Sequence, residues 1–294
     1  MTDPTETTAP GAAGALPSVW MQDLTWEEVA GYLEHERIAV VPVGSTEQHG
    51  PAGVLGVDAY VAITLAEDLA RRTGVLCTPP IWFGDSSHHG AFPGTLSIQA
   101  STLSLLVRDV CRSLARHGFD RIVLVNGHKG SNLPALTTSL RQLHDEELPG
   151  VLFAVADPLH LARSAAPGLK DVNEHHGGEL ELSHVHHRIP GSVRTDRLTD
   201  AGVDFQEVFG GFVGDDLFGP APDGVDIIWS GEEQRRFAPT GSFSSSTGLS
   251  EEKGRRYHDH IVARLAELIA WLRTYDGPVG AKRTGRGPEG PAAG

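Results

Sequence analysis

Residues 38–51 read Ile-Ala-Val-Val-Pro-Val-Gly-Ser-Thr-Glu-Gln-His-Gly-Pro, so an apolar run passes directly into a group of polar side chains. The run is short and rich in β-branched residues, which is typical of a buried strand. Glu47 and His49 follow the carboxyl end of this strand, and Asp58 comes nine residues after His49. Carboxylate and imidazole groups are the ligands of water-activating divalent metals, and α/β enzymes place such sites at strand ends. These three residues are therefore candidate metal ligands.

Three further apolar runs alternate with segments that carry apolar residues at three- and four-residue spacing. The runs at 75–79, 122–125 and 151–155 are predicted strands, and the segments at 59–72, 102–117 and 133–146 are predicted helices. Gly74 and Gly118 are expected to end helices, and a last helix is predicted from an N-cap at Ser250 to about residue 275. Residues 199–246, rich in glycine and proline, are predicted to form irregular loops. The alternation indicates an α/β fold: a three-layer α/β/α domain around a largely parallel central sheet.

The low-complexity ends, residues 1–16 and 276–294, are predicted to be disordered tails around one domain at 17–275. With 39% apolar and 21% charged residues, the chain has enough apolar material for a sizeable core. Its formal net charge of −14 argues against non-specific binding of nucleic acid. No apolar stretch is long enough to span a bilayer, so neither membrane insertion nor export is expected. Cys77 and Cys111 are expected to be buried free thiols, which fits a cytoplasmic location.

A second polar segment, Asn126-Gly-His-Lys-Gly-Ser-Asn132, follows the third predicted strand and precedes a helix. Its glycine turn at a helix N-terminus would suit a phosphate, although the P-loop and the dinucleotide fingerprint are both absent. Alternatively, His128 is a metal ligand and the glycines let the backbone pass close to the site. A purely structural turn is the third interpretation. Taken together with the ligands after the first strand, the segment favours a metal-binding His128.

The chain contains 15 histidines, several of them in adjacent pairs. In the third polar segment, His175-His-Gly-Gly-Glu-Leu-Glu181, the glycines are expected to precede a short helix. Glu179 in its first turn is then a candidate ligand, and His176 just outside it is a candidate proton carrier. A solvated helix start with an acidic first turn is the alternative, and Glu181, on another face of the helix, is assigned to it.

The fourth polar segment, residues 84–95, is rich in glycine, serine and histidine and follows a predicted strand. A loop of this kind is expected to form a pocket wall or lid, together with residues 210–246. No Gly-x-Ser-x-Gly elbow surrounds Ser86, so a serine nucleophile is disfavoured.

Four short strings occur in the order and spacing of the creatininase (creatinine amidohydrolase) family. They are Gly44-Ser-Thr-Glu-Gln-His-Gly-Pro51, Phe92-Pro-Gly-Thr95, Asn126-Gly-His128 and His176-Gly-Gly-Glu179. The chain resembles this family over most of residues 35–190 and again at the helix start 252–254. The resemblance implies a dinuclear-metal hydrolase, mainly of amide C–N bonds, with an α/β/α fold and often a hexameric assembly. It also implies a ligand set: Glu47 and His128 on one side of the metal pair, His49 and Glu179 on the other, and Asp58 bridging.

The chain departs from creatininase itself at three positions. Where creatininase has a glutamate ligand two residues after the histidine of the Asn-Gly-His string, this chain has Gly130, which transfers the fifth ligand role to Glu179. Two aromatic residues that clamp creatinine correspond to Lys129 and Val172, so creatinine is not the expected substrate. Lys129 suggests an anionic group on the substrate, with a solvated lysine as the alternative. The first string also resembles the mycofactocin-system branch, whose member trims a modified peptide.

The sequence therefore predicts a hydrolase that cleaves a linear or cyclic amide C–N bond with a metal-bound hydroxide. The expected cofactors are two divalent ions, Zn²⁺ or Mn²⁺ with Fe²⁺ as a further option, and His176 is the expected proton carrier. The residues predicted to bind the substrate are Ser86, His89, Lys129 and Asn132. A metal-dependent lactonase, a C–C hydrolase of a cyclic small molecule and a non-catalytic metal-binding oligomer are the alternatives. The expected partners are a small-molecule or modified-peptide amide and further copies of the chain, with a hexamer implied by the resemblance.

Overall fold

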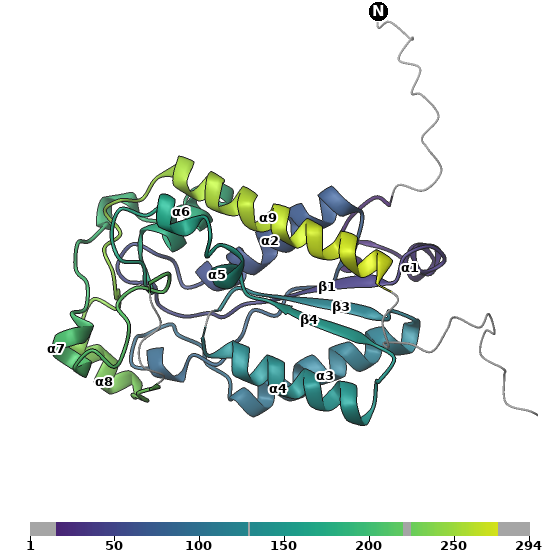
Figure 1. Cartoon of the computed structure of the whole chain (residues 1–294), viewed down its shortest axis with the longest axis horizontal. Coiled ribbons are helices and arrows are strands. Elements are labelled where there is room, and N and C mark those ends of the chain that lie inside the picture. Colours follow the sequence, from purple (N-terminus) through teal and green to yellow (C-terminus); the bar gives the residue numbers. More distant parts are fainter. Residues whose placement is uncertain (1–15, 129, 220–224, 276–294) are drawn as a thin grey trace, which may run out of the picture.

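A four-stranded parallel sheet lies at the centre of the protein, whose computed structural model describes residues 16–128, 130–219 and 225–275 (Figure 1). The strands are β1 (Ile38–Val43), β2 (Leu76–Cys77), β3 (Arg121–Asn126) and β4 (Leu152–Ala156), in the order β2-β1-β3-β4. β1 pairs with β3 in parallel register along its whole length, from Ile38 opposite Arg121 to Val43 opposite Asn126. β1 and β3 are thus central strands, which explains why their sequences are continuous apolar runs.

Helices cover both faces of the sheet, because alternate residues of each strand point to opposite sides (Figure 1). Val40 and Val123 pack among residues from α2 (Val57–Thr73), α6 (Glu179–Arg188) and α9 (Glu251–Thr274). Val41 and Leu124 pack on the other face among residues from α1 (Trp26–Leu33), α3 (Ala100–His117) and α4 (Asn132–Glu146). The predicted three-layer α/β/α architecture with a parallel sheet is confirmed.

The ends of the helices follow local signals in the sequence. Gly74 (φ 76°) and Gly118 (φ 107°) end α2 and α3 in the left-handed conformation, as predicted. Ser250 caps α9 by accepting a hydrogen bond from the backbone N–H three residues further on. A capping box of Thr25 and Glu28 starts α1, a helix that was not predicted from the sequence.

The segment predicted to be irregular, residues 199–246, contains two short helices, which corrects that prediction. These are α7 (Phe205–Phe209) and α8 (Gly231–Phe237), and the equally short α5 (Pro158–Leu161) follows β4. The remaining described elements are the 3₁₀ helices η1 (Met21–Asp23), η2 (Ser87–His89), η3 (Ala166–Gly168) and η4 (Thr195–Arg197). Phe205, Ala238 and Phe243 form a small apolar cluster around which this segment packs. Helices of five and seven residues are too short for their periodicity to be recognised in the sequence.

Three further expectations concern the ends of the chain, the cysteines and membranes. The two tails predicted to be disordered, 1–16 and 276–294, lie outside the described residues apart from Leu16. Cys77 and Cys111 are buried free thiols, as predicted. Among the helices of the described ranges, none combines the length and apolar character needed to cross a bilayer.

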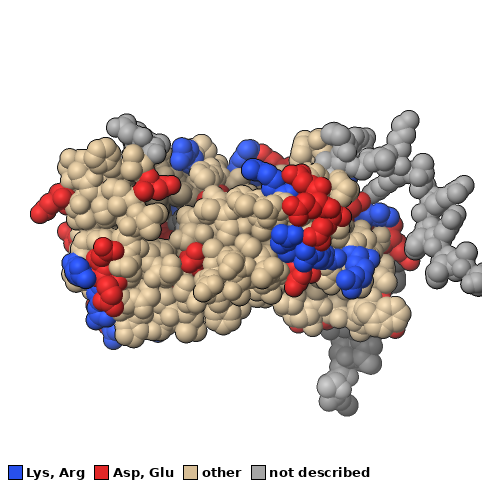
Figure 2. All heavy atoms as spheres, turned by 90° about the horizontal axis from the view of Figure 1, so that it is seen from below, with Lys and Arg blue, Asp and Glu red and all other residues tan. Residues whose placement is uncertain are grey.

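Charged side chains are unevenly spread over the face formed by α3 and α4 (Figure 2). They gather toward the two ends, with the larger group at one of them, and the middle of the face carries few of them. On α3, Arg108 and Arg112 pair with Glu147 at 2.8 and 2.7 Å. Exposed ion pairs contribute only about 0–1 kcal/mol each. The buried side chains of Leu103 and Leu136, which are 0% exposed, therefore hold these two helices on the sheet.

The carboxyl ends of β1 and β3 meet the first turn of α2 at very short range. A Cβ at Gly44 would lie 2.4 Å from the Cα of Ala59, and a Cβ at Gly127 would lie 2.0 Å from the carbonyl oxygen of Asp58. Both distances are far below van der Waals contact, so a side chain at either position would push α2 away. Glycine at these two positions lets the helix place Asp58 against the strand ends.

Replacing Gly127 by alanine is expected to lower the free energy of unfolding by about 1–3 kcal/mol, because the new methyl group overlaps the backbone of α2. Gly150→Ala is the matched control, since a Cβ there would meet no atom within 4 Å. This control should change the free energy of unfolding by less than about 0.5 kcal/mol. Urea denaturation at one protein concentration measures both variants, and equal stability would contradict the close packing of α2.

Candidate metal centre

Five buried side chains from separate parts of the chain converge at the carboxyl edge of the sheet. Glu47 and His49 lie in the loop after β1, and Asp58 lies in the first turn of α2. His128 follows β3, and Glu181 lies in α6. Their exposed fractions range from 0% to 6%, although all five are polar or ionisable. Burying such groups is costly unless they are paired or bind a metal, so their convergence requires a chemical reason.

Two groups of side chains at this edge place their ligand atoms within 4.8 Å of one another. The groups are Glu47–Asp58–His128 and His49–His176–Glu181. Asp58 joins them, because its Oδ1 lies 3.3 Å from His49 Nε2 and its Oδ2 lies 3.2 Å from His128 Nδ1. A carboxylate whose two oxygens face different histidines has the geometry of a bridge between two ions.

Backbone carbonyl groups fix the tautomers of the three histidines in these groups. The distances to the carbonyl oxygen are 3.1 Å for His49 Nδ1, 2.9 Å for His128 Nε2 and 2.7 Å for His176 Nε2. The acceptors are, in the same order, the carbonyl oxygens of Glu47, Asp85 and Gln48. In a neutral imidazole the nitrogen that donates carries the only proton, so the other nitrogen has a bare lone pair. When neutral, as a ligating imidazole must be, each of the three rings therefore directs a bare nitrogen toward the centre, as metal-binding histidines do.

Several atoms of the centre are buried and receive no hydrogen bond from the described residues. They are both carboxylate oxygens of Glu47, Nε2 of His49 and Oδ2 of Asp58. Leaving one buried polar atom unpaired costs about 1–3 kcal/mol, and native proteins contain few such atoms. Coordination of divalent ions would satisfy all of these atoms, so the residues present fit a metal centre.

Electrostatic coupling shifts several pKa values of the metal-free centre. Burial raises the pKa of Glu47 against the opposing effect of His128. Burial alone would lower the pKa of His49, but the Asp58 carboxylate reverses this and raises it to about 9. The pKa of His128 is also lowered by burial, yet the carboxylates of Glu47 and Asp58 raise it to about 10. Burial, aided by His49, holds the pKa of His176 well below its usual range, so this imidazole is neutral and able to accept a proton.

Glu179, predicted as the fifth ligand, lies outside the centre, and Glu181 occupies the predicted place. The Glu179 carboxylate accepts hydrogen bonds from Lys253 Nζ at 2.7 Å and from the backbone N–H of Val172 at 3.2 Å. Glu181 Oε2 instead lies 3.7 Å from His49 Nε2. Residues two apart on an α-helix are about 200° apart around its axis, so only one of the two glutamates faces the centre. The sequence shows the acidic pair but not the rotation of α6.

Ser86 and Asn132 are fully buried and do not line the pocket. Both side chains are 0% exposed. The Ser86 hydroxyl contacts that of Ser45, and Asn132 Nδ2 donates to the carbonyl oxygen of Gly44 at 3.1 Å. Both side chains thus hold loops against the strand ends, which corrects their predicted role in substrate binding. Lys129 lies outside the described residues, and its role stays a prediction.

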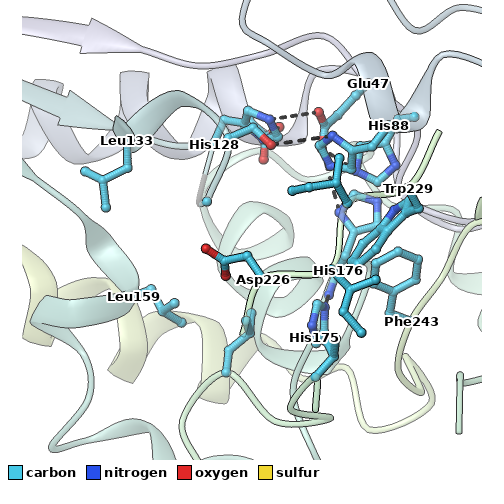
Figure 3. A pocket seen from close by; sticks show the side chains of 18 of the residues that line it. Glu47, His88, His128, Leu133, Leu159, His175, His176, Asp226, Trp229 and Phe243 are labelled. Atoms are coloured by element: carbon cyan, nitrogen blue, oxygen red, sulfur yellow. Dashed lines mark hydrogen bonds and ion pairs between the residues drawn. The ribbon is translucent and has the colours of Figure 1, made fainter. Parts of the chain in front are cut away.

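A pocket of about 640 Å³ opens beside the centre (Figure 3). The two loops predicted to form it both contribute, since Ser87, His88 and His89 line one side and residues between 213 and 243 line another. The apolar and aromatic residues of the lining are Leu133, Leu159, Val213, Leu217, Val225, Ile227, Ile228, Trp229 and Phe243. The aromatic pair Trp229 and Phe243 was not predicted from the sequence, because an isolated aromatic residue in a loop gives no sign of which space it faces.

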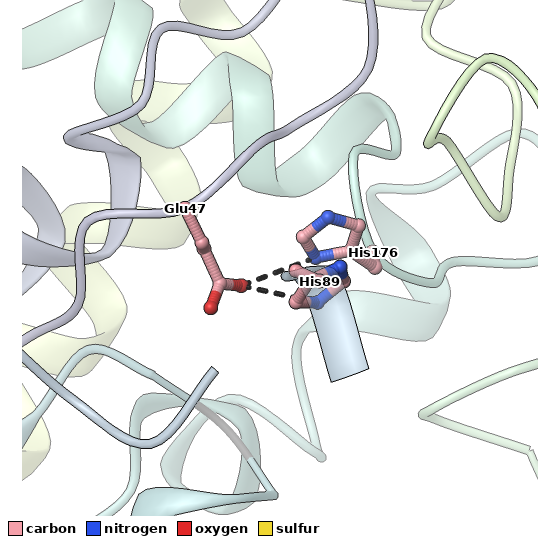
Figure 4. A group of neighbouring side chains, drawn as sticks. All are labelled: Glu47, His89 and His176. Carbon is pink, nitrogen blue, oxygen red and sulfur yellow. Dashed lines mark ion pairs between the residues drawn. The ribbon is translucent and has the colours of Figure 1, made fainter. Parts of the chain in front are cut away.

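His89, predicted to bind substrate, stacks on His176 beside Glu47 (Figure 4). The two ring centroids are 4.2 Å apart. His89 Nε2 lies 3.3 Å and His176 Nδ1 lies 3.7 Å from Oε1 of Glu47. These side chains form a third group whose ligand atoms lie within 4.8 Å of one another, so the two imidazoles directly adjoin the first group of ligands.

Residues 22–269 match the family model described as creatininase, creatinine amidohydrolase. The creatinine amidohydrolase of Pseudomonas putida is 29% identical over 268 residues, which cover 86% of this chain and 96% of that protein. The mycofactocin precursor peptide peptidase of Mycobacterium ulcerans is 37% identical over 169 residues, which cover 54% of this chain and 62% of that protein. The first likeness extends over nearly the whole chain, and the second is higher over a shorter stretch.

Solved creatininases share the fold. A mutant creatininase of Zn–Zn type has a TM-score of 0.72 and 26% identity, covering 87% of this chain and 99% of its own. A manganese form of creatininase has a TM-score of 0.71 and 26% identity, covering 87% of this chain and 98% of its own. Divalent metals are therefore bound by proteins similar to this one.

Metal binding at pH 7.5 is expected to release at least one proton per chain. The pKa values of His49 and His128 are raised to about 9 and about 10 in the metal-free centre, so both rings are protonated at this pH. A ligating imidazole must lose that proton, and the apparent affinity for Zn²⁺ should therefore increase with pH toward 9. Calorimetric titration in buffers of different ionisation enthalpy measures the released protons. A binding enthalpy independent of the buffer would contradict these protonation states.

Glu181→Gln is expected to lower the number of ions that the centre retains, because an amide is a much weaker ligand than a carboxylate. Glu179→Gln is the matched control and should retain as much metal as the wild type, since Glu179 pairs with Lys253. Metal analysis by mass spectrometry after loading with Zn²⁺ and dialysis counts the ions in both variants. Loss of an ion from Glu179→Gln alone would reinstate Glu179 as the ligand.

Proposed function

The chain belongs to the creatininase family, and we propose that this metal-dependent amidohydrolase cleaves amide C–N bonds with two divalent ions. The position of Asp58 carries the proposal, because its two oxygens face histidines of two different ligand groups. The proposed ligands are Glu47, Asp58 and His128 for one ion and His49, Asp58 and Glu181 for the other. This mixed set of nitrogen and oxygen donors suits Zn²⁺ or Mn²⁺.

His176 is the proton carrier in this proposal. Divalent ions in such a centre lower the pKa of water toward neutrality and polarise a carbonyl oxygen. Nδ1 of His176 accepts a proton from the attacking water, since Nε2–H is held on the carbonyl oxygen of Gln48 at 2.7 Å. The water oxygen bonds to the amide carbon, the C–N bond breaks, and His176 returns the proton to the leaving nitrogen. An amide and water thus give a carboxylic acid and an amine.

The pocket supports a substrate that is larger and more apolar than creatinine. Its volume of about 640 Å³ lies in the range of pockets that enclose drug-sized ligands. The described residues of its lining include leucine, valine, isoleucine, tryptophan and phenylalanine but neither lysine nor arginine. A short modified peptide with apolar side chains meets these conditions. The likeness to a mycofactocin precursor peptide peptidase supports the same class of substrate.

Assays of metal-loaded protein on matched lactam and lactone pairs, and on short peptides with apolar carboxyl-terminal residues, test the reaction. Amide hydrolysis that a chelator abolishes and added Zn²⁺ or Mn²⁺ restores would support the proposal. Hydrolysis of lactones alone would favour a metal-dependent lactonase. Fewer than two ions per chain, with no hydrolysis of either class, would favour a non-catalytic metal-binding protein.

His176→Ala is expected to keep both ions and to lower kcat by about 10²–10⁴, because the proton carrier is removed and no proposed ligand is changed. Glu47→Gln should lose metal and activity together. His144→Ala is the control, since His144 Nδ1 hydrogen-bonds the carbonyl oxygen of Val151 at 3.0 Å, away from the pocket. Metal analysis and kcat are measured on the same preparations. A fully active His176→Ala, or one that has lost an ion, would disprove this acid–base assignment.

A further inference from the structure

His89 differs from the other histidines of the centre in the groups that fix its tautomer. Its Nδ1 lies 2.9 Å from the side-chain nitrogen of Gln48 and 2.7 Å from that of Gln234. The histidines of the two ligand groups each face a backbone carbonyl oxygen, although Nε2 of His176 also lies 2.9 Å from the side-chain nitrogen of Gln48. His89 is 1% exposed and Gln234 is 0% exposed, so these contacts are shielded from water.

The orientation of the Gln48 amide is set independently of His89. Its Oε1 accepts a hydrogen bond from the backbone N–H of Gly50 at 2.9 Å, and its Nε2 donates to the carbonyl oxygen of Gly241 at 3.1 Å. A backbone N–H only donates and a carbonyl oxygen only accepts, so the oxygen and nitrogen of this amide are not interchangeable. The NH₂ group of Gln48 therefore faces both Nδ1 of His89 and Nε2 of His176, each at 2.9 Å. Because Nε2 of His176 donates its proton to the carbonyl oxygen of Gln48, Nδ1 of His89 is the acceptor.

A histidine that accepts at Nδ1 is neutral and carries its proton on Nε2. In His89 this N–H lies on the side of the pocket, 3.3 Å from Oε1 of Glu47. That oxygen receives no hydrogen bond from the described residues, so Glu47 does not occupy the donor. A protonated nitrogen cannot ligate a metal. His89 is therefore unsuited to be a ligand, although it lies in a group with Glu47 and His176.

We propose that Nε2–H of His89 donates a hydrogen bond to the oxygen of the scissile carbonyl as that oxygen gains negative charge. The inference rests on the amide hydrolysis proposed above. His176 and His89, whose ring centroids are 4.2 Å apart (Figure 4), then have different roles. His176 transfers the proton of the attacking water, and His89 retains the proton on its Nε2. A preorganised donor aimed at a developing oxyanion contributes about 10²–10³ in kcat. His89 is a catalytic residue in this scheme, and Gln48 is its positioning residue.

Nitrogen NMR of Zn²⁺-loaded protein labelled with ¹⁵N-histidine tests the tautomer without any substrate. The signals of His89 are identified by their absence from the His89→Gln variant. Nε2 is expected to be protonated and Nδ1 to have the chemical shift of an unprotonated acceptor. A proton on Nδ1, or Nε2 bound to Zn²⁺, would overturn the proposal.

Steady-state kinetics test the catalytic role with whichever amide the wild-type protein hydrolyses in the lactam and peptide assays. His89→Ala is expected to keep two ions, to lower kcat about 100-fold and to change KM less than about threefold. His89→Gln should recover at least about tenfold of this loss, because its amide N–H reaches the position of Nε2. His144→Ala is the control and should match the wild type. Loss of an ion from His89→Ala, or a kcat within about threefold of the wild type, would refute the role.

Two patterns of results separate this inference from the function on which it rests. If the wild-type protein hydrolysed no amide, the proposed function and the role of His89 in it would both be rejected. If the wild-type protein hydrolysed amides and His89→Ala matched it, only the role of His89 would be rejected.

Discussion

The placement of one carboxylate, Asp58, between two histidines is the constraint on which the rest of the site depends. Asp58 is 2% exposed, and although burial would raise its pKa, His49 and His128 hold that pKa well below its usual range. The two histidines come from the ends of different strands, so the carboxylate reaches both only where α2 touches the sheet edge. Gly44 and Gly127 permit that contact, because neither has a side chain to separate the helix from the strand ends. The packing of α2 and the geometry of the metal centre are therefore one structural requirement.

Residues that contribute no ligand atoms determine how the ligands point. Asn132 donates to the carbonyl oxygen of Gly44 and accepts from the backbone N–H of Asp85, which joins the end of β1 to the loop at 84–95. The carbonyl oxygen of Asp85 then accepts from His128 Nε2 and leaves Nδ1 free to face Asp58. The ligand orientation is thus set by buried amide groups before any ion binds. Such preorganisation is the main source of electrostatic catalysis, because nothing has to reorient during the reaction.

The sequence alone predicted the elements that have a regular apolar pattern and the polar residues that lie next to a strand end. The apolar runs predicted the strands, and Glu47, His49, Asp58 and His128 were expected at the sheet edge because each follows a strand or starts a helix. Glu179 was chosen wrongly over Glu181 because the rotation of α6 depends on its packing against α9 and on Lys253, 74 residues further along the chain. The predicted substrate-binding roles of Ser86 and Asn132 differ from their positions in the structure for a similar reason. Polar side chains in a loop bind either substrate or neighbouring backbone, and only the tertiary contacts distinguish the two.

In the proposed function, reaction chemistry and substrate choice belong to different parts of this fold. The candidate ligands come from the strand ends, α2 and α6, whereas most of the apolar pocket wall comes from residues 213–243. That wall can change without altering the ligands, which explains how one family includes relatives named for substrates as different as creatinine and a precursor peptide. Gln48 connects the two parts, since it lies between two ligands in the sequence and yet hydrogen-bonds Gly241 and His89. A change in the wall near Gly241 would therefore reach His89 through the amide group of Gln48. Gln234 and Phe243 of the same segment contact His89 and the backbone of His176 directly, so specificity and catalysis are coupled where the wall meets these histidines.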